Sequence, residues 1–174
     1  MPKTAKLRKP PNQERIDLVE TADEAKQHRH HFTLYPKFWT DFNDPTVLKW
    51  HVVPFDEAQR TNIPQVQGVY AFIVKPAASA SLQPSYLLYI GETTGQTLRE
   101  RFNQYVRGIA NLEERPKLIT TLPKYEGFVY FHFAEVPPGG PTPVDIENNL
   151  LSGFVPPLNT KFSGIVSKVV SAFT

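Results

Sequence analysis

Apolar side chains concentrate in three short segments, which polar, glycine-rich or proline-rich stretches separate. These segments are residues 67–74, 86–90 and 127–136, and aromatic and β-branched residues dominate each of them. Such a composition predicts strands. Residues 127–136 also alternate between two faces, as a pleated strand does. Residues 75–85 connect the first two segments, so we expect an antiparallel hairpin with a long loop.

Five further segments carry apolar residues at the spacing of an amphipathic helix. We expect helices over residues 14–31, 98–109, 112–122, 143–153 and 165–173. Thr97 and Thr142 precede two of these helices and can cap them, because a threonine hydroxyl accepts a hydrogen bond from a backbone N–H of the first turn. Together the elements predict an α+β fold, in which a small three-stranded antiparallel sheet is flanked by helices.

An N-terminal extension, residues 1–65, precedes this part of the chain. Residues 1–13 predict a flexible basic arm, because the first eleven positions hold four cationic side chains and no acidic one. This arm could touch a phosphate backbone or serve as a solvated end, and the sequence leaves both open. Residues 14–65 carry many aromatic side chains interrupted by prolines, which indicates short elements packed on the main domain. This part could also select a substrate.

The overall composition is that of an ordinary globular protein. Of the 174 residues, 40% are hydrophobic and 21% are charged. We expect no membrane association, because no apolar run is long enough to span a bilayer. A cytoplasmic location is expected, since the chain has no cysteine and its start does not resemble a secretory signal. The formal net charge of +2 does not by itself indicate a polyanionic partner.

One stretch combines a strand, a glycine turn and a charged helix. The strand that contains Tyr89 ends at Gly91, and the following helix carries Arg99, Arg101 and Tyr105. At roughly 100° per residue, Arg101 and Tyr105 lie about 40° apart, whereas Arg99 points about 160° away from Arg101. A guanidinium and a phenol beside a glycine turn suit an anionic ligand such as phosphate. The alternative is a surface helix whose arginine covers apolar surface.

The helix predicted at residues 143–153 places a carboxylate in an apolar stripe. With Ile146 at 0° on the helical wheel, the apolar stripe extends to roughly 140° at Leu151, and Glu147 falls inside it at about 100°. A carboxylate in such a place needs a partner, because burying an unpaired charge is costly. The partner could be Arg101 in a structural ion pair, or a magnesium ion. A rigid turn after this helix then presents the amide of Asn159.

Taken together, these pieces resemble the GIY-YIG nuclease superfamily. The resemblance covers about residues 66–162. The family's two signatures look like Gly68-Val69-Tyr70 and Tyr89-Ile90-Gly91, and its arginine helix is similar to residues 98–105. Residues 146–151 resemble the segment of its metal-binding glutamate, and residues 156–159 resemble its closing turn. The domain organisation that follows is an arm (1–13), an extension (14–65), a nuclease domain (66–162) and a C-terminal helix (163–174).

The resemblance implies a metal-dependent endonuclease that hydrolyses phosphodiester bonds in DNA. Glu147 would hold one divalent ion, most often Mg²⁺ with Mn²⁺ as an alternative, and Arg101 would clamp a phosphate oxygen. Tyr70 or Tyr89 would take a proton from the attacking water, and Tyr70 is the preferred base.

Two further residues receive roles from the same resemblance. Tyr105 would contact phosphate or water, and Asn159 would fix the geometry around Glu147. Gly68 and Gly91 would belong to the site as members of the two signatures.

The chain also departs from the family pattern. The interval between Tyr70 and Tyr89 is long, and Glu92 stands where several relatives carry lysine. The choice of Arg101 over Arg99 depends on the match of the arginine helix. Other functions stay open: a non-catalytic nucleic-acid-binding module, or a nuclease directed at RNA. The sequence does not decide between a monomer and a homodimer.

Overall fold

A computed structural model describes residues 11–43, 46–76, 83–108 and 115–172 of the chain. The chain divides into two compact units, residues 1–31 and residues 32–174. The first unit contains helix α1 (Pro11–Lys26), which confirms the helix predicted there but begins and ends earlier than expected. Most of the predicted basic arm lies outside the described residues.

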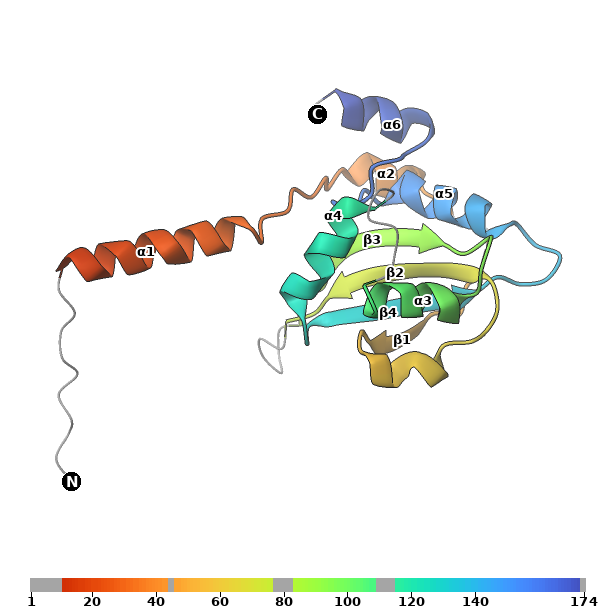
Figure 1. Ribbon diagram of the computed structural model, residues 1–174. Helices are drawn as coiled ribbons and strands as arrows, with labels where there is room; N and C mark the ends of the chain where they lie inside the picture. The colour runs from red at the N-terminus through yellow and green to blue at the C-terminus, as the bar shows by residue number, and fades with distance from the viewer. Residues whose placement is uncertain (1–10, 44–45, 77–82, 109–114, 173–174) are drawn as a thin grey trace. The chain divides into compact units, whose positions relative to one another are not determined.

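The second unit is built on a four-stranded antiparallel sheet (Figure 1). Its strands are β1 (His51–Pro54), β2 (Gly68–Val74), β3 (Tyr86–Glu92) and β4 (Val129–Glu135), in the spatial order β1-β4-β2-β3. The α+β class is confirmed, but the prediction of three strands is wrong. The sequence did not indicate β1 because this strand is only four residues long, mostly exposed and closed by a proline.

The predicted hairpin forms between β2 and β3, and β2 also pairs with β4 along its whole length. This central place explains why β2 is almost entirely buried. Phe72 pairs with Tyr89 and Ile73 pairs with Leu87, so Leu88 is an extra residue in a bulge. β3 is left at the edge of the sheet, with β2 as its single neighbour in the described strand order.

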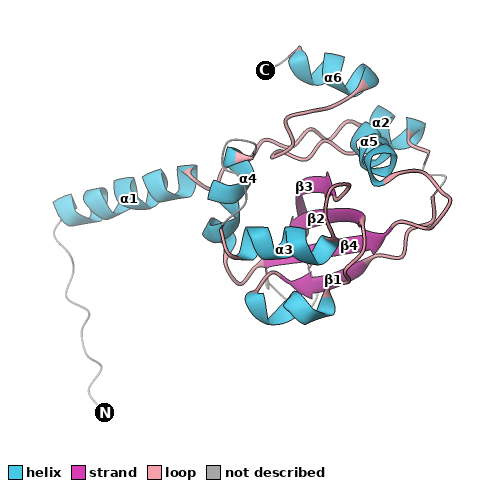
Figure 2. Ribbon diagram, turned by 45° about the vertical axis from the view of Figure 1, so that its right-hand side comes forward, coloured by secondary structure: helices cyan, strands magenta, loops and turns pink. Residues whose placement is uncertain are grey.

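The described residues of this unit also form seven helical elements (Figures 1 and 2). They are α2 (Pro36–Asp41), η1 (Glu57–Asn62), α3 (Leu98–Val106), α4 (Pro116–Thr121), η2 (Leu122–Tyr125), α5 (Pro143–Gly153) and α6 (Gly164–Ser171). The predicted caps of α3 and α5 are confirmed: the hydroxyls of Thr97 and Thr142 accept hydrogen bonds from the backbone N–H of Glu100 and Asp145. α4 begins at Pro116, because proline suits the first turn of a helix and not its interior, and residues 112–114 of the helix predicted here lie outside the described residues.

The two faces of the sheet carry separate cores. On one face, Tyr70 and Phe72 of β2 pack with Phe102 of α3. On the other face, Val69 and Ala71 pack with the apolar residues of α5. The side chains of β2 alternate, so α3 and α5 lie on opposite faces of the sheet. β3 also contributes to both cores, with Tyr89 in the first and Ile90 in the second.

Gly68 and Gly91 are required by packing. A Cβ on Gly68 would lie 2.8 Å from the Cδ1 atom of Leu98, and one on Gly91 would lie 2.5 Å from the Cζ atom of Tyr70. Both distances are shorter than real Cβ contacts allow. Gly68 thus lets β2 approach β4 and α3 closely, and Gly91 lets β3 approach the ring of Tyr70.

None of the helices in the described part of the chain combines the length and the apolar run that a bilayer crossing requires.

Candidate active site

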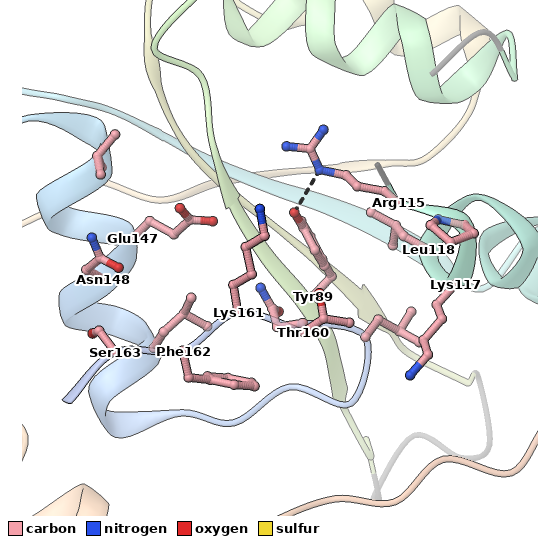
Figure 3. Close-up of a pocket in the computed structure, with 15 residues that line it drawn as sticks. Tyr89, Arg115, Lys117, Leu118, Glu147, Asn148, Thr160, Lys161, Phe162 and Ser163 are labelled. Carbon is pink, nitrogen blue, oxygen red and sulfur yellow. Dashed lines mark hydrogen bonds between the residues drawn. The ribbon is translucent and has the colours of Figure 1, made fainter. Parts of the chain in front are cut away.

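A cavity of about 780 Å³ opens at the edge of the sheet, beside β3 (Figure 3). Its walls come from β3, from the start of α4, from α5 and from residues 158–163, which we call the 158–163 segment. The polar side chains that line it include Tyr89, Arg115, Lys117, Glu147, Asn159 and Lys161. Three of the predicted site residues, Tyr89, Glu147 and Asn159, therefore share one cavity.

Tyr89 presents its hydroxyl to an arginine that the sequence analysis did not select. The Nε–H of Arg115 donates a hydrogen bond to the Tyr89 hydroxyl oxygen at 3.1 Å (Figure 3). Burial raises the pKa of Tyr89, the neighbouring Tyr105 adds to the rise, and the charge of Arg115 opposes it. Arg115 directly precedes α4. It therefore brings a permanent positive charge to the phenol.

Tyr70 occupies a different position from Tyr89. Its side chain is completely buried, and its hydroxyl lies 3.0 Å from the hydroxyl of Tyr105 in a hydrogen bond. Burial raises the pKa of Tyr70 well above 10, and the neighbouring Tyr105 and Tyr89 raise it further. Tyr70 is not among the residues that line the cavity. This geometry favours Tyr89 over Tyr70 as the phenol that can reach a bound water.

Arg101 lies on α3, next to the ring of Tyr105. Its guanidinium carbon lies 5.9 Å from the centre of the Tyr105 ring, and its Nη1 donates to the side-chain oxygen of Gln104 at 3.2 Å. Its charge also acts on Tyr70, where it partly offsets the rise in pKa. In the described part of the chain no ion pair joins Arg101 to Glu147. The structural ion pair that the sequence left open is therefore not formed.

Arg99 points away from this group, as the helical wheel predicted. Its Nε–H donates to the backbone carbonyl of Ile63 at 2.6 Å, and its Nη2 donates to the carbonyl of Thr61. Arg99 thus ties α3 to the end of η1. This finding agrees with the choice of Arg101 as the arginine that faces the tyrosines.

Glu147 enters the cavity from α5, on the other face of the sheet. Its side chain is half-buried, and burial raises its pKa from 4.5 to about 7. The charge of Glu92, at the end of β3, adds to this rise, and Arg115 opposes it. The carboxylate therefore lies in a place where a positive charge would stabilise its ionised form.

Glu147 is the carboxylate of the cavity that could bind a hard divalent cation. Magnesium keeps several of its waters and needs only one or two carboxylates from the protein. Among the described residues, no group of three or more histidine, cysteine, aspartate or glutamate side chains could hold a metal. A metal at this place would be bound by Glu147. Glu92 is the acidic residue whose charge raises the pKa of Glu147. A single carboxylate is compatible with a Mg²⁺ ion that keeps most of its waters.

Asn159 fastens the 158–163 segment to the edge strand. Its side-chain oxygen accepts from the backbone N–H of Ile90 at 3.0 Å, and its amide nitrogen donates to the Ile90 carbonyl at 2.8 Å. The backbone N–H of Leu158 also donates to the carbonyl of Leu88 at 3.0 Å. The amide thus continues the hydrogen bonding of β3 where no further strand follows. Asn159 and Glu147 both line the cavity, and the two side-chain hydrogen bonds of Asn159 go to Ile90.

Two residues of the cavity carried no recognisable signal in the sequence. Arg115 follows residues 109–114, which lie outside the described ranges, and Lys161 lies two positions beyond Asn159. Arg115 lies within the helix predicted at residues 112–122 but directly precedes α4 in the structure, and Lys161 lies between α5 and α6. Their positive charge was the one property that could have marked them as site residues, and many surface residues carry the same charge.

The comparisons with known proteins give no relative. No family model matches the sequence, and no curated protein or solved structure matches the chain. The function must therefore be argued from the site itself.

Proposed function

We propose that this chain is a metal-dependent endonuclease that hydrolyses phosphodiester bonds in DNA. The observation that carries the proposal is the meeting of Tyr89, Arg115 and Glu147 at one cavity. A phenol, a guanidinium and a half-buried carboxylate supply the three properties that phosphodiester hydrolysis needs. These are a proton acceptor for water, a cation for the phosphate and an oxygen ligand for a divalent ion.

Tyr89 is the residue to which we assign the general base. A phenol of ordinary pKa is a weak base at neutral pH, and burial raises the pKa of Tyr89 further. The charge of Arg115 acts in the opposite direction, because it stabilises the phenolate. The hydrogen bond from Arg115 also fixes the direction of the Tyr89 oxygen.

The position of Tyr89 is supported by three residues farther from the cavity, Tyr70, Tyr105 and Arg101. The hydrogen bond between Tyr70 and Tyr105 joins β2 to α3, and the ring of Tyr70 lies 6.1 Å from that of Tyr89. These contacts set the position of the Tyr89 ring. Arg101 adds a second guanidinium charge on the side of Tyr105. Arg101 remains a proposed phosphate-binding residue and Tyr105 a proposed contact to phosphate or water, although neither is among the residues that line the cavity.

Glu147 would hold the divalent ion. When bound, such an ion supplies positive charge that stabilises the phosphate and the departing oxygen. The carboxylate must lose its proton to act as a ligand, and its pKa of about 7 makes this step sensitive to pH near neutrality. Asn159 would keep the opposite wall of the cavity in place through its two bonds to Ile90.

The experiment that tests the proposal is cleavage of supercoiled, linear duplex and single-stranded DNA, and of RNA, by the purified full chain. We expect cleavage of DNA with Mg²⁺ or Mn²⁺ and none with EDTA. The Glu147→Ala variant should lose metal-dependent cleavage while its circular dichroism spectrum stays unchanged.

The other outcomes of this assay are equally informative. Binding of DNA without cleavage under any metal condition would identify a non-catalytic binding module. Cleavage of RNA alone would change the substrate class. Full activity of Glu147→Ala would remove the metal assignment.

A further inference from the structure

Lys161 enters the cavity from the 158–163 segment. Figure 3 shows its side chain directed into the cavity, toward the end where the Tyr89 hydroxyl and the Glu147 carboxylate lie. The ammonium group of Lys117, which also lines the cavity, points toward the opposite end (Figure 3). Two lysines of the same cavity therefore differ in where they place their charge.

The backbone on both sides of Lys161 is anchored. On one side, Asn159 holds the main chain of Ile90 through two hydrogen bonds. On the other side, Phe162 packs against the core between the sheet and α5. A lysine between two such anchors has a fixed Cα position and direction, unlike a lysine on an unattached loop. Less conformational entropy is then lost when its ammonium binds a ligand.

The charges of the cavity favour an anion. Its lining contains three cationic side chains, Arg115, Lys117 and Lys161, against the single acid Glu147. Among the described residues no ion pair joins Lys161 to Glu147, so Lys161 does not serve it as a structural counter-ion. An ammonium that is held in a concave site and has no such structural task suits a phosphate group.

We propose that Lys161 binds a phosphate group of the nucleic-acid backbone in this cavity, across from Arg115. The inference rests on the proposed function, because it names the group that would hold the substrate of that site. A lysine contact to phosphate positions the backbone and carries no sequence information. Lys161 therefore contributes to affinity for any sequence, while the register of the scissile bond is set by Arg115, Tyr89 and Glu147.

The test is the binding of a fluorescent duplex oligonucleotide in EDTA, which separates binding from cleavage. Anisotropy titrations at several salt concentrations would give the dissociation constant and the slope of log K against log[salt]. For Lys161→Ala we expect weaker binding, by about 3- to 10-fold, and a slope reduced by about 1. Lys161→Arg should restore both quantities, because it keeps the charge.

Lys117→Ala is the matched control, since it removes the same charge from the same cavity. We expect it to change the slope much less than Lys161→Ala does. A slope unchanged in Lys161→Ala, or reduced equally by both variants, would overturn the proposal.

These results do not depend on whether the chain cleaves DNA. A wild-type protein that binds duplex through Lys161 but never cleaves with Mg²⁺ would refute the proposed hydrolysis and leave the Lys161 contact standing. A wild-type protein that cleaves, with Lys161→Ala binding normally, would refute the Lys161 contact alone. A wild-type protein that binds no nucleic acid would refute both.

Discussion

The Nε–H of Arg115 donates a hydrogen bond of 3.1 Å to the hydroxyl of Tyr89. This contact joins the residue before α4 to the edge strand β3, 26 positions earlier in the chain. It places a guanidinium, which stays protonated at every physiological pH, against a phenol whose pKa is raised by burial. The pair is the part of the candidate site that most directly ties the fold to the proposed chemistry.

Replacement of Arg115 should reduce the rate of cleavage. In Arg115→Ala, Tyr89 loses both its hydrogen-bond donor and the charge that opposes its raised pKa. We expect kcat to fall by about 10- to 100-fold, which is less than the full rate acceleration that a general base supplies. Arg115→Lys should recover some of this loss because the charge returns. Steady-state kinetics with Mg²⁺ would measure both variants.

The control for Arg115 is Arg107→Ala. Arg107 is exposed and lies 3.6 Å from Glu57 in a surface ion pair, a kind of contact that contributes little. Its removal should leave kcat nearly unchanged. Equal losses in Arg115→Ala and Arg107→Ala would mean that general electrostatics, and not the contact with Tyr89, explain the result.

The two signature tyrosines should respond differently to the loss of their hydroxyls. Tyr89→Phe removes the proposed base, and we expect a loss of activity of about 100-fold or more. Tyr70→Phe removes a buried hydrogen bond to Tyr105, so we expect a loss of stability of about 1 kcal/mol and a smaller loss of activity. Urea unfolding and cleavage rates on both variants would check this. The reverse order of activities would return the role of base to Tyr70.

Glu147 should make stability depend on pH. Its pKa is raised from 4.5 to about 7 in the folded chain, so folding favours the protonated form. The associated stabilisation is complete at a pH below 4.5 and is lost as the pH rises toward 7. We expect Glu147→Gln, which cannot ionise, to lack this loss. In EDTA its Tm relative to wild type should therefore rise between pH 4.5 and pH 7.

Asp145 provides a control of opposite sign on the same helix. Its hydrogen bonds with the side chain and backbone of Thr142 lower its pKa, so the stabilisation it contributes is lost as the pH falls. The loss of Tm caused by Asp145→Asn should therefore be smallest at acidic pH.

Mg²⁺ should raise the Tm of wild type at pH 8 and not that of Glu147→Gln, because the metal needs the ionised carboxylate. The same Mg²⁺ effect in both proteins would contradict a site at Glu147.

Gly91, the last residue of the second signature, should not tolerate a side chain. A Cβ at Gly91 would lie 2.5 Å from Cζ of the completely buried Tyr70, which has no room to move away. We expect Gly91→Ala to destabilise the chain by about 1–3 kcal/mol in urea unfolding. Gly95→Ala is the control, since nothing lies within 4 Å of its Cβ position. Equal effects of the two changes would show that the contact with Tyr70 is not the cause.

Much of the fold could be predicted because its signals are local. The composition of β2, β3 and β4 indicated strands, and the threonines before α3 and α5 indicated where those helices begin. Each signal depends on residues within one turn or one strand. β1 gave no such signal, because a strand of four residues at the sheet edge shows no readable alternation.

By itself, the sequence determined the elements that carry Tyr89, Glu147 and Asn159, since these residues lie in segments of clear pattern. The tertiary structure alone decided which tyrosine reaches the cavity and which cations join it. The burial of Tyr70 depends on packing against Tyr105, and the environment of Tyr89 depends on Arg115. These partners are 35 and 26 positions apart. Local periodicity is limited to a few residues, so it carries no information about contacts of that range.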